Sequence, residues 1–364
     1  MSTFGPDPEH RFAFGLRTTD HTHPSDALEP IEPWEFVYRL GDVGAWGVGV
    51  HDDDLVPVGA SSSERDDIVD KVAKALDSTG MVVSISSANL SGHPVFGHGA
   101  FTSADRDVRR YAIQKAMRAI DLGTELGATL HELSGEASES IAAKPPLDVL
   151  DRFREAVDFL CAYACEQGYP ARFALRPRPH DGQADSFLST IGHALAFIAT
   201  LDRPDMVGLG PATGHENGGV HDGCHGVAQA VEAGKLFHLR LDAQPAFVLV
   251  KLLEESSYDG PLHFDIEMSC IDDAAEIWDV TAGCMRTYRT FVAKARRFAD
   301  DPEIRDALAA CGADELATPS VGPFSADVGR ALSGERFDPS ELLQRRYRDQ
   351  RLDQLVTDLV LGLR

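Results

Sequence analysis

The sequence has few cysteines, and they are not arranged as metal ligands. Six cysteines are spread over 364 residues without a CxxC pair, and the nearest two, Cys161 and Cys165, are one helical turn apart. This spacing argues against a cysteine-based zinc site. A chain of this length also buries enough surface to fold without disulfides. We therefore expect a cytoplasmic protein with reduced thiols.

Positive charge is scarce. The chain has 34 Lys and Arg against 58 Asp and Glu, which gives a formal net charge of −24. Such a surface repels phosphate backbones and anionic bilayers, so we expect neither a nucleic acid nor a membrane as partner. Any cluster of Lys and Arg in this acidic chain must therefore be local. Such a cluster is a candidate functional feature.

Long apolar runs are missing as well. No stretch has the length of a membrane span, and the first residues, MSTFGPDPEHRF, lack the apolar core of a signal peptide. No GxGxxG phosphate-binding motif follows a strand-like segment. The 43% hydrophobic and 25% charged residues are typical of a globular protein.

The sequence does contain a regular alternation of short apolar runs and longer amphipathic segments. Several amphipathic segments end in glycine, as helices commonly do, namely at Gly80, Gly127, Gly168, Gly234 and Gly260. The runs that favour strands cover residues 12–17, 46–51, 81–86, 128–133, 171–176, 206–211, 235–241 and 260–266. Eight strands alternating with eight helices predict an α/β fold, a closed (β/α)8 barrel over residues 1–300.

The pattern changes at residue 301. Residues 301–364 resemble short helices joined by turns rich in Pro, Gly and Ser, with too few apolar residues for a separate core. We expect an extended C-terminal helical arm that packs against another subunit.

In barrels of this kind, chemistry is placed where strands end and loops begin. The residues at those points include Arg17, His51 to Asp54, Asn89, Ser134, Arg176, Arg178, His215, Glu216, Arg240, Asp242 and Asp265. Four of these are arginines, which is unexpected for so acidic a chain.

Several motifs resemble those of the actinobacterial xylose isomerases. They are HDDDLVP (51–57), HPVF (93–96), FTSADRDVRRYA (101–112), GHALAF (192–197), AGKLFH (233–238), HFD (263–265) and AGCMR (282–286). The similarity runs in order from about residue 10 to the C-terminus. It implies a TIM barrel with a subunit-associating arm, assembled as a homotetramer or homodimer.

The resemblance also implies roles for site residues. In that family a histidine oriented by an aspartate three residues on opens the sugar ring, and His51 and Asp54 match this pair. Two divalent ions held by carboxylates and one histidine then assist a hydride shift. Of these ligands, His215 and Asp265 match.

The remaining ligand positions depart from the family. The acid-Pro-Lys-Pro motif is Arg176-Pro-Arg178-Pro here, Ala212 replaces the bridging glutamate, and Arg240 replaces the aspartate of the seventh strand. The loop that supplies two more aspartates is deleted after residue 242. Arg17 and Ser134 correspond to tryptophans of the sugar site. Because guanidinium is always charged and cannot bind a cation, the sequence predicts that the metal site is lost and that no other cofactor replaces it.

We therefore expect a metal-independent isomerase, epimerase or lyase that acts on a small anionic metabolite. The anion would be bound by Arg17, Arg176, Arg178 and Arg240, because Asp265 alone cannot offset four cations. His51, oriented by Asp54, would act as general acid and base, with His215 and Asp265 assisting. The adjacent Asp52 and Asp53 are expected to be solvated acids of the turn.

Three alternatives stay open. Arg240 and Asp265 could simply pair with each other, as in a non-catalytic ligand-binding pseudoenzyme. A residual metal-dependent aldose–ketose isomerase is a weaker possibility, and so is a replacement metal site in residues 214–226. In addition, only one of His131 and Glu132 can point into the barrel, and Glu132 there would be a second acid.

Overall fold

The computed structural model describes most of the chain. The described residues are 9–16, 31–90, 92–134, 137–138, 145–177, 185–213, 222–242, 245–266, 274–313, 318–344 and 349–364. By its internal contacts the chain divides into two units, residues 1–288 and 289–364.

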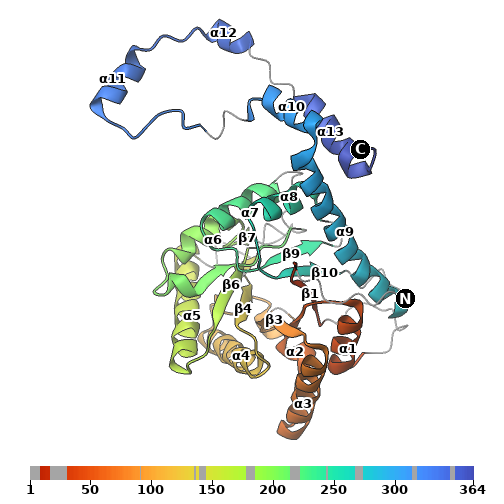
Figure 1. Ribbon diagram of the computed structural model, residues 1–364. Helices are drawn as coiled ribbons and strands as arrows, with labels where there is room; N and C mark the ends of the chain where they lie inside the picture. Colours follow the sequence, from red (N-terminus) through yellow and green to blue (C-terminus); the bar gives the residue numbers. More distant parts are fainter. Residues whose placement is uncertain are drawn as a thin grey trace. The chain divides into compact units, whose positions relative to one another are not determined.

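The first unit is built on one sheet of eight parallel strands (Figure 1). They are β1 (Phe12–Gly15), β2 (Gly47–His51), β3 (Val82–Ser87), β4 (Leu130–Ser134), β6 (Arg172–Arg176), β8 (Val207–Leu209), β9 (Leu239–Asp242) and β10 (Leu262–Asp265). Their order is β8-β6-β4-β3-β2-β1-β10-β9, and the bridges Leu209–Leu236 and Ala212–Arg240 join the two ends. The predicted (β/α)8 barrel and its eight strands are confirmed.

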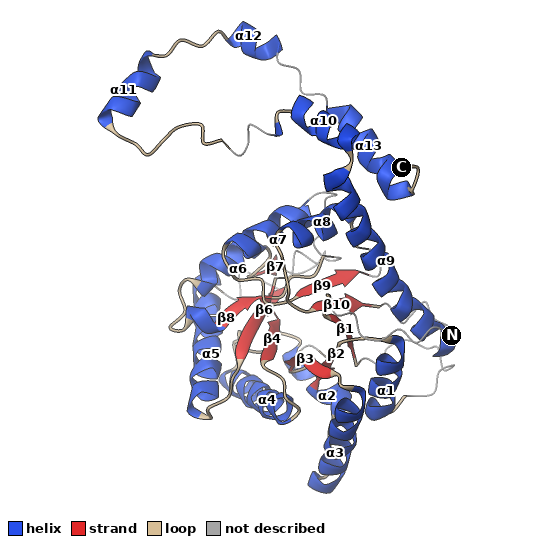
Figure 2. Ribbon diagram, viewed as in Figure 1, coloured by secondary structure: helices blue, strands red, loops and turns tan. Residues whose placement is uncertain are grey.

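Helices surround the strands, as Figure 2 shows. They are α1 (Pro33–Val43), α3 (Ser62–Thr79), α4 (Arg106–Glu125), α5 (Pro146–Glu166), α6 (Ile191–Ile198), α7 (Asp222–Glu232), α8 (Phe247–Glu255) and α9 (Ala274–Asp300). Residues with a preference for helix ends are found at the ends of α3. Ser61 and Glu64 form a reciprocal capping box at the start of α3, and Gly80 follows its last turn at φ 70°. After α8, by contrast, Ser257 and not Gly260 takes the left-handed conformation, at φ 54°.

Some short elements have no counterpart in the predicted pattern. They are the helix α2 (Asp52–Leu55), the 3-10 turns η1 (Pro94–Phe96) and η2 (Pro204–Met206), and the two-stranded ribbon β5 (Ala137–Ser138) and β7 (Asp185–Ser186). Each is too short to produce a hydrophobic period of its own.

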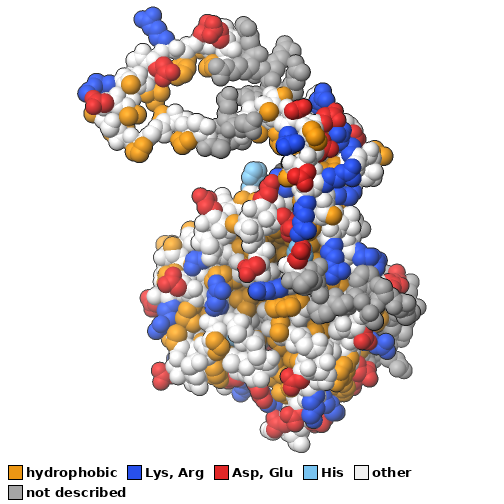
Figure 3. Space-filling view, in the orientation of Figure 1, with side chains coloured by type: hydrophobic (Ala, Val, Ile, Leu, Met, Phe, Trp, Pro, Cys, Tyr) orange, Lys and Arg blue, Asp and Glu red, His pale blue; other side chains and the backbone are white. Residues whose placement is uncertain are grey.

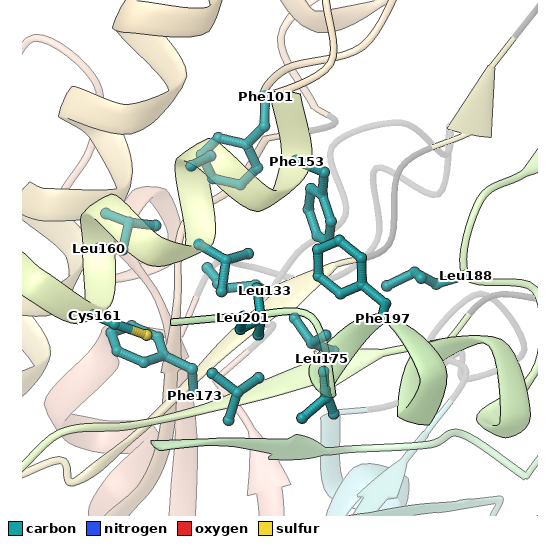
Figure 4. Close-up of a cluster of buried hydrophobic side chains, with 14 of the residues drawn as sticks. Phe101, Leu133, Phe153, Leu160, Cys161, Phe173, Leu175, Leu188, Phe197 and Leu201 are labelled. Atoms are coloured by element: carbon teal, nitrogen blue, oxygen red, sulfur yellow. The ribbon is translucent and has the colours of Figure 1, made fainter. Parts of the chain in front are cut away.

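Successive side chains along each strand point alternately outward, toward the helices, and inward, into the barrel. The outward side chains of β4 and β6, including Leu133, Phe173 and Leu175, pack against α5 and α6 in a buried cluster with Phe153 and Phe197 (Figure 4). Burying each such side chain stabilises the fold by about 1.5–3 kcal/mol.

The inward side chains fill the barrel. Ile85, Leu130, Ala174 and Phe237 form a small apolar cluster inside it. Farther along the same strands the inward positions become polar, with Glu132 on β4 and Arg176 on β6. The inward residues thus change from apolar to charged along the strands. This change indicates that the functional site lies at the carboxyl ends of the strands.

The second unit begins within α9 and continues through α10 (Pro302–Ala310), α11 (Ala326–Gly334), α12 (Pro339–Gln344) and α13 (Asp349–Leu361). Helices α10 and α13 pack together, and Arg364 at the end of the chain lies 2.7 Å from Glu303 and 3.2 Å from Asp301. Apolar side chains in α11 and in the segments on either side of it are exposed, among them Phe324, Leu332 and Phe337, and Figure 3 shows apolar side chains on the surface of this part of the chain.

None of the helices in the described part of the chain is long and apolar enough to cross a membrane.

His131 is a buried polar side chain in the layer between the sheet and the surrounding helices. Its ring points away from the barrel interior, next to Gly123 of α4 and 5.9 Å from the Phe173 ring. Neither ring nitrogen has a hydrogen-bond partner among the described residues. Burial lowers the pKa of His131 from 6.5 to about 4.

We predict that this histidine makes the fold acid-sensitive. The unfolded chain protonates His131 near pH 6.5 and the folded protein only near pH 4, so stability falls as the pH is lowered through this window. The loss should reach about 1.4 kcal/mol per pH unit. Denaturant unfolding of His131→Phe between pH 7 and pH 4 should show a smaller slope, whereas His225→Gln at an exposed position should keep the wild-type slope. An unchanged slope in His131→Phe would contradict this account.

Candidate active site

A cavity of about 260 Å³ opens at the carboxyl ends of the strands. Its apolar walls include Phe14, Phe36 and Ile277. The polar side chains that line it are His51, Ser87, Arg176, Arg240, His263, Asp265 and Thr281. They come from β2, β3, β6, β9, β10 and α9, so the fold brings distant parts of the sequence to one place.

The cavity gathers four of the predicted site residues, His51, Arg176, Arg240 and Asp265. Asp54 lies in α2, just after His51, and is not among the described residues that line the cavity. The other predicted residues, Arg17, Arg178 and His215, lie outside the described residues.

Arg240 is held by two carboxylates. It donates from Nε and Nη2 to the two oxygens of Glu132, at 2.9 and 3.0 Å, and from Nη1 to Asp265 at 2.8 Å. Glu132 and Arg240 are 3% and 6% exposed, so water screens this pair very little. Burial alone would raise the pKa of Glu132, but Arg240, His238 and Arg176 lower it well below its usual range.

Arg176 lies beside the same two acids at longer range. Its Nη1 is 3.9 Å from Glu132 and its Nη2 is 3.9 Å from Asp265. Arg176, Arg240, Glu132 and Asp265 therefore carry formal charges that cancel. Of the two alternatives for strand β4, it is Glu132 that points into the barrel, where it supplies a second carboxylate beside Asp265. The pairing of Arg240 with Asp265, kept open as an alternative, is present.

His51 has a partner that the sequence did not indicate. Its Nδ1 lies 2.8 Å from the Ser87 hydroxyl, on the neighbouring strand β3 and in register with it. Ser87 is buried at the cavity wall. The hydrogen bond fixes the plane of the imidazole toward the cavity.

Asp52 and Asp53 were expected to be solvated acids of the turn, but both carboxylates contact a lysine. Lys115 of α4 lies 2.6 Å from Asp52 and 2.5 Å from Asp53, and Asp52 also accepts from the backbone of Asn89 at 2.8 Å. The lysine is largely buried. These contacts fasten α2 to α4 and so hold the backbone that carries His51.

Two buried histidines complete the surroundings of Glu132 and Asp265. His238 Nε2 lies 3.2 Å from a Glu132 oxygen, and His263 Nε2 lies 3.8 Å from an Asp265 oxygen. Burial lowers the pKa of both, that of His263 to about 3. Both imidazoles are therefore neutral at pH 7.

Comparison with known proteins identifies the family. The xylose isomerase of Thermus thermophilus is 41% identical to this chain, over 99% of the chain and 100% of the relative. The chain belongs to the xylose isomerase family. The xylose isomerase of Thermus caldophilus is 39% identical with the same coverage, and the family model described as xylose isomerase-like TIM barrel matches residues 37–248. The resemblance seen in the sequence is confirmed.

Solved structures share the fold at low identity. An L-ribulose 3-epimerase superposes with a TM-score of 0.61 at 18% identity, covering 86% of this chain and 100% of that one. A D-allulose 3-epimerase from Methylomonas sp. gives 0.56 at 13% identity, covering 79% and 99%. These likenesses bear on the fold alone.

The residues in place of the xylose isomerase ligands do not fit two divalent ions. Arg176 and Arg240 stand at two implied carboxylate positions, and Ala212 at a third is buried without a donor atom. Asp265, which matches a ligand, is bonded to Arg240. Among the described residues no group of three or more His, Cys, Asp and Glu side chains is arranged to hold a metal.

Proposed function

We propose that this member of the xylose isomerase family is a metal-independent isomerase, epimerase or lyase that moves a proton next to a carbonyl group. Its substrate would be a small anionic metabolite with a carboxylate or phosphate. The observation that carries the proposal is the pair Arg176 and Arg240, which line one cavity together with His51. The relatives named isomerases and epimerases share the fold and support this class of reaction.

His51 would be the general acid and base. An imidazole is suited to proton transfer near neutral pH, and its bond to Ser87 aims the ring at the cavity. Asp54 would support it from the same turn, as the family resemblance implies. Asp265, at the cavity wall, would assist.

The anion would be bound by arginines. Arg176 and Arg240 both line the cavity, and Arg176 lies 3.9 Å from Glu132 and from Asp265. Arg17 and Arg178 are expected to join them, and His215 to assist. Four arginines against Glu132 and Asp265 would leave two positive charges for the ligand.

One observation favours a second candidate, a ligand-binding protein without activity. Arg240 donates all three of its described hydrogen bonds to the protein's own carboxylates, as internal pairing requires. The two candidates differ in whether a proton is exchanged.

Proton exchange with solvent tests the proposal before a product is known. Chelator-treated protein is incubated in D₂O with a panel of sugar acids, sugar phosphates and 2-oxo acids, and NMR detects loss of the hydrogen next to the carbonyl. We expect exchange with at least one anion, reduced at least about 100-fold in His51→Asn. His225→Asn, the same change at an exposed position, should keep the wild-type rate.

Other outcomes would overturn the proposal. Binding of an anion without exchange would indicate the ligand-binding protein. Turnover of xylose that requires added Mn²⁺ would indicate a residual aldose isomerase.

We further propose that α11 and α12 form an arm that embraces another copy of the chain, in a homotetramer or homodimer. Phe324 is 88% and Phe337 59% exposed within the chain, which is costly unless a partner covers them. Sedimentation equilibrium of the full chain should give a dimer or tetramer, and Phe324→Glu/Phe337→Glu should shift it toward monomer. A monomeric wild-type protein would contradict the proposal.

A further inference from the structure

The cavity of the candidate active site extends beyond the barrel interior. On one side it is lined by Arg176 and Arg240, whose guanidinium groups lie inside the barrel next to Glu132. On the other side it is lined by Phe36 of α1 and Ile277 of α9, and both helices lie outside the strands (Figure 1). A cavity that touches both sets of residues must pass over the carboxyl ends of the strands between them.

Strand β1 separates the two sides and ends in a glycine. Helix α9 packs on the outer face of β1, where the rings of Phe12 and Tyr288 are 5.5 Å apart. Phe14, two residues after Phe12, lies on the same face and stacks on Phe264 of β10 at 5.5 Å. The last residue of β1, Gly15, lines the cavity and has no side chain that could close the passage.

The outer part of the cavity is apolar. This part, which we call the apolar compartment, is lined by the buried side chains of Phe14, Phe36, Phe264 and Ile277. Thr281, one turn after Ile277 on α9, lies beside them, but its hydroxyl donates to the Ile277 carbonyl at 2.7 Å. Among the described residues, the apolar compartment therefore offers a ligand hydrocarbon contact and no side-chain donor that is not already used.

We infer that the apolar compartment binds the hydrocarbon part of the substrate, which is a small 2-oxo acid with an aliphatic side chain. The inference names the substrate class of the proposed function and rests on its arginine-bound anion. A carboxylate held by Arg176 and Arg240 leaves the other end of such a molecule to cross Gly15 into the apolar compartment. A sugar acid would place hydroxyl groups there, and each hydroxyl buried without a partner weakens binding by about tenfold or more.

A 2-oxo acid also suits the proton transfer. His51 takes a proton from C3, and the electron pair of the C3–H bond forms the C2=C3 bond of an enolate. The enolate oxygen then carries a negative charge on the side of the cavity that Arg176 and Arg240 line. Return of a proton from His51 to C3 restores the carbonyl group, and in D₂O a deuteron is returned instead.

Three acids separate an aliphatic substrate from a sugar acid. 4-Methyl-2-oxopentanoate and 2-oxogluconate have the same number of carbons, one carboxylate and hydrogen on C3, and pyruvate lacks the side chain. NMR follows deuterium exchange at C3 with chelator-treated protein, and each rate is divided by the rate with imidazole alone. We expect kcat/KM for 4-methyl-2-oxopentanoate to exceed that for pyruvate about 50-fold, because each buried carbon contributes about fourfold. It should exceed that for 2-oxogluconate at least about 100-fold.

A substitution in the apolar compartment should change this ratio. In Ile277→Thr we expect the preference for 4-methyl-2-oxopentanoate over pyruvate to fall about tenfold, because a hydroxyl replaces hydrocarbon at the wall. Ile120→Thr makes the same change at a buried helix position in the cluster around Phe153, which does not line the cavity, and should keep the native ratio. Both acids are measured on the same protein, so a partly unfolded variant does not alter the ratio.

The inference and the proposed function can fail separately. Exchange of 2-oxogluconate or of sugar phosphates at rates equal to or above that of 4-methyl-2-oxopentanoate would refute the apolar compartment as a substrate site and leave the proposed function standing. Exchange with no anion would refute the proposed function. Calorimetric titration with the same three acids then decides the inference, which requires 4-methyl-2-oxopentanoate to bind most tightly and Ile277→Thr to weaken that binding.

Discussion

The ion pair between Glu132 and Arg240 is the interaction on which the rest of the site depends. Both groups are buried inside the barrel, where an isolated charge is not tolerated, and each neutralises the other through two hydrogen bonds. Removing one member of such a pair costs about 3–5 kcal/mol in proteins. Asp265, Arg176, His238 and His263 are arranged around this pair. In this chain the interior of the barrel therefore contains charges of both signs that neutralise one another.

The fold could be predicted from the sequence because it rests on periodicity. The eight strands appear as apolar runs buried on both faces, and the helices between them have capping signals such as Ser61 with Glu64 and glycines such as Gly80. These signals are local, so one sequence is enough to find them. Elements of two to four residues, such as α2 and β5, have no such period.

The partners in the site could be predicted only in part because they are set by three-dimensional contacts. Alternation along β4 placed either His131 or Glu132 in the barrel, but not both, and nothing local indicated that Glu132 would meet Arg240, 108 residues away. Ser87 and Lys115 were missed for the same reason. His238, just before β9, and His263, on β10, lie against Gly210 and Gly49, a pairing of large and small residues that appears only once the barrel is closed.

We propose that in this chain arginines replace the divalent ions that the family resemblance implies, so that the protein works without metal. Calorimetric titration of chelator-treated native protein with Mn²⁺ and Mg²⁺ tests it most directly, with Asp265→Asn as the comparison. We expect no saturable heat that depends on Asp265. Tight binding of one or two ions, lost in Asp265→Asn, would show that a metal site persists and that the roles given to Arg176 and Arg240 are wrong.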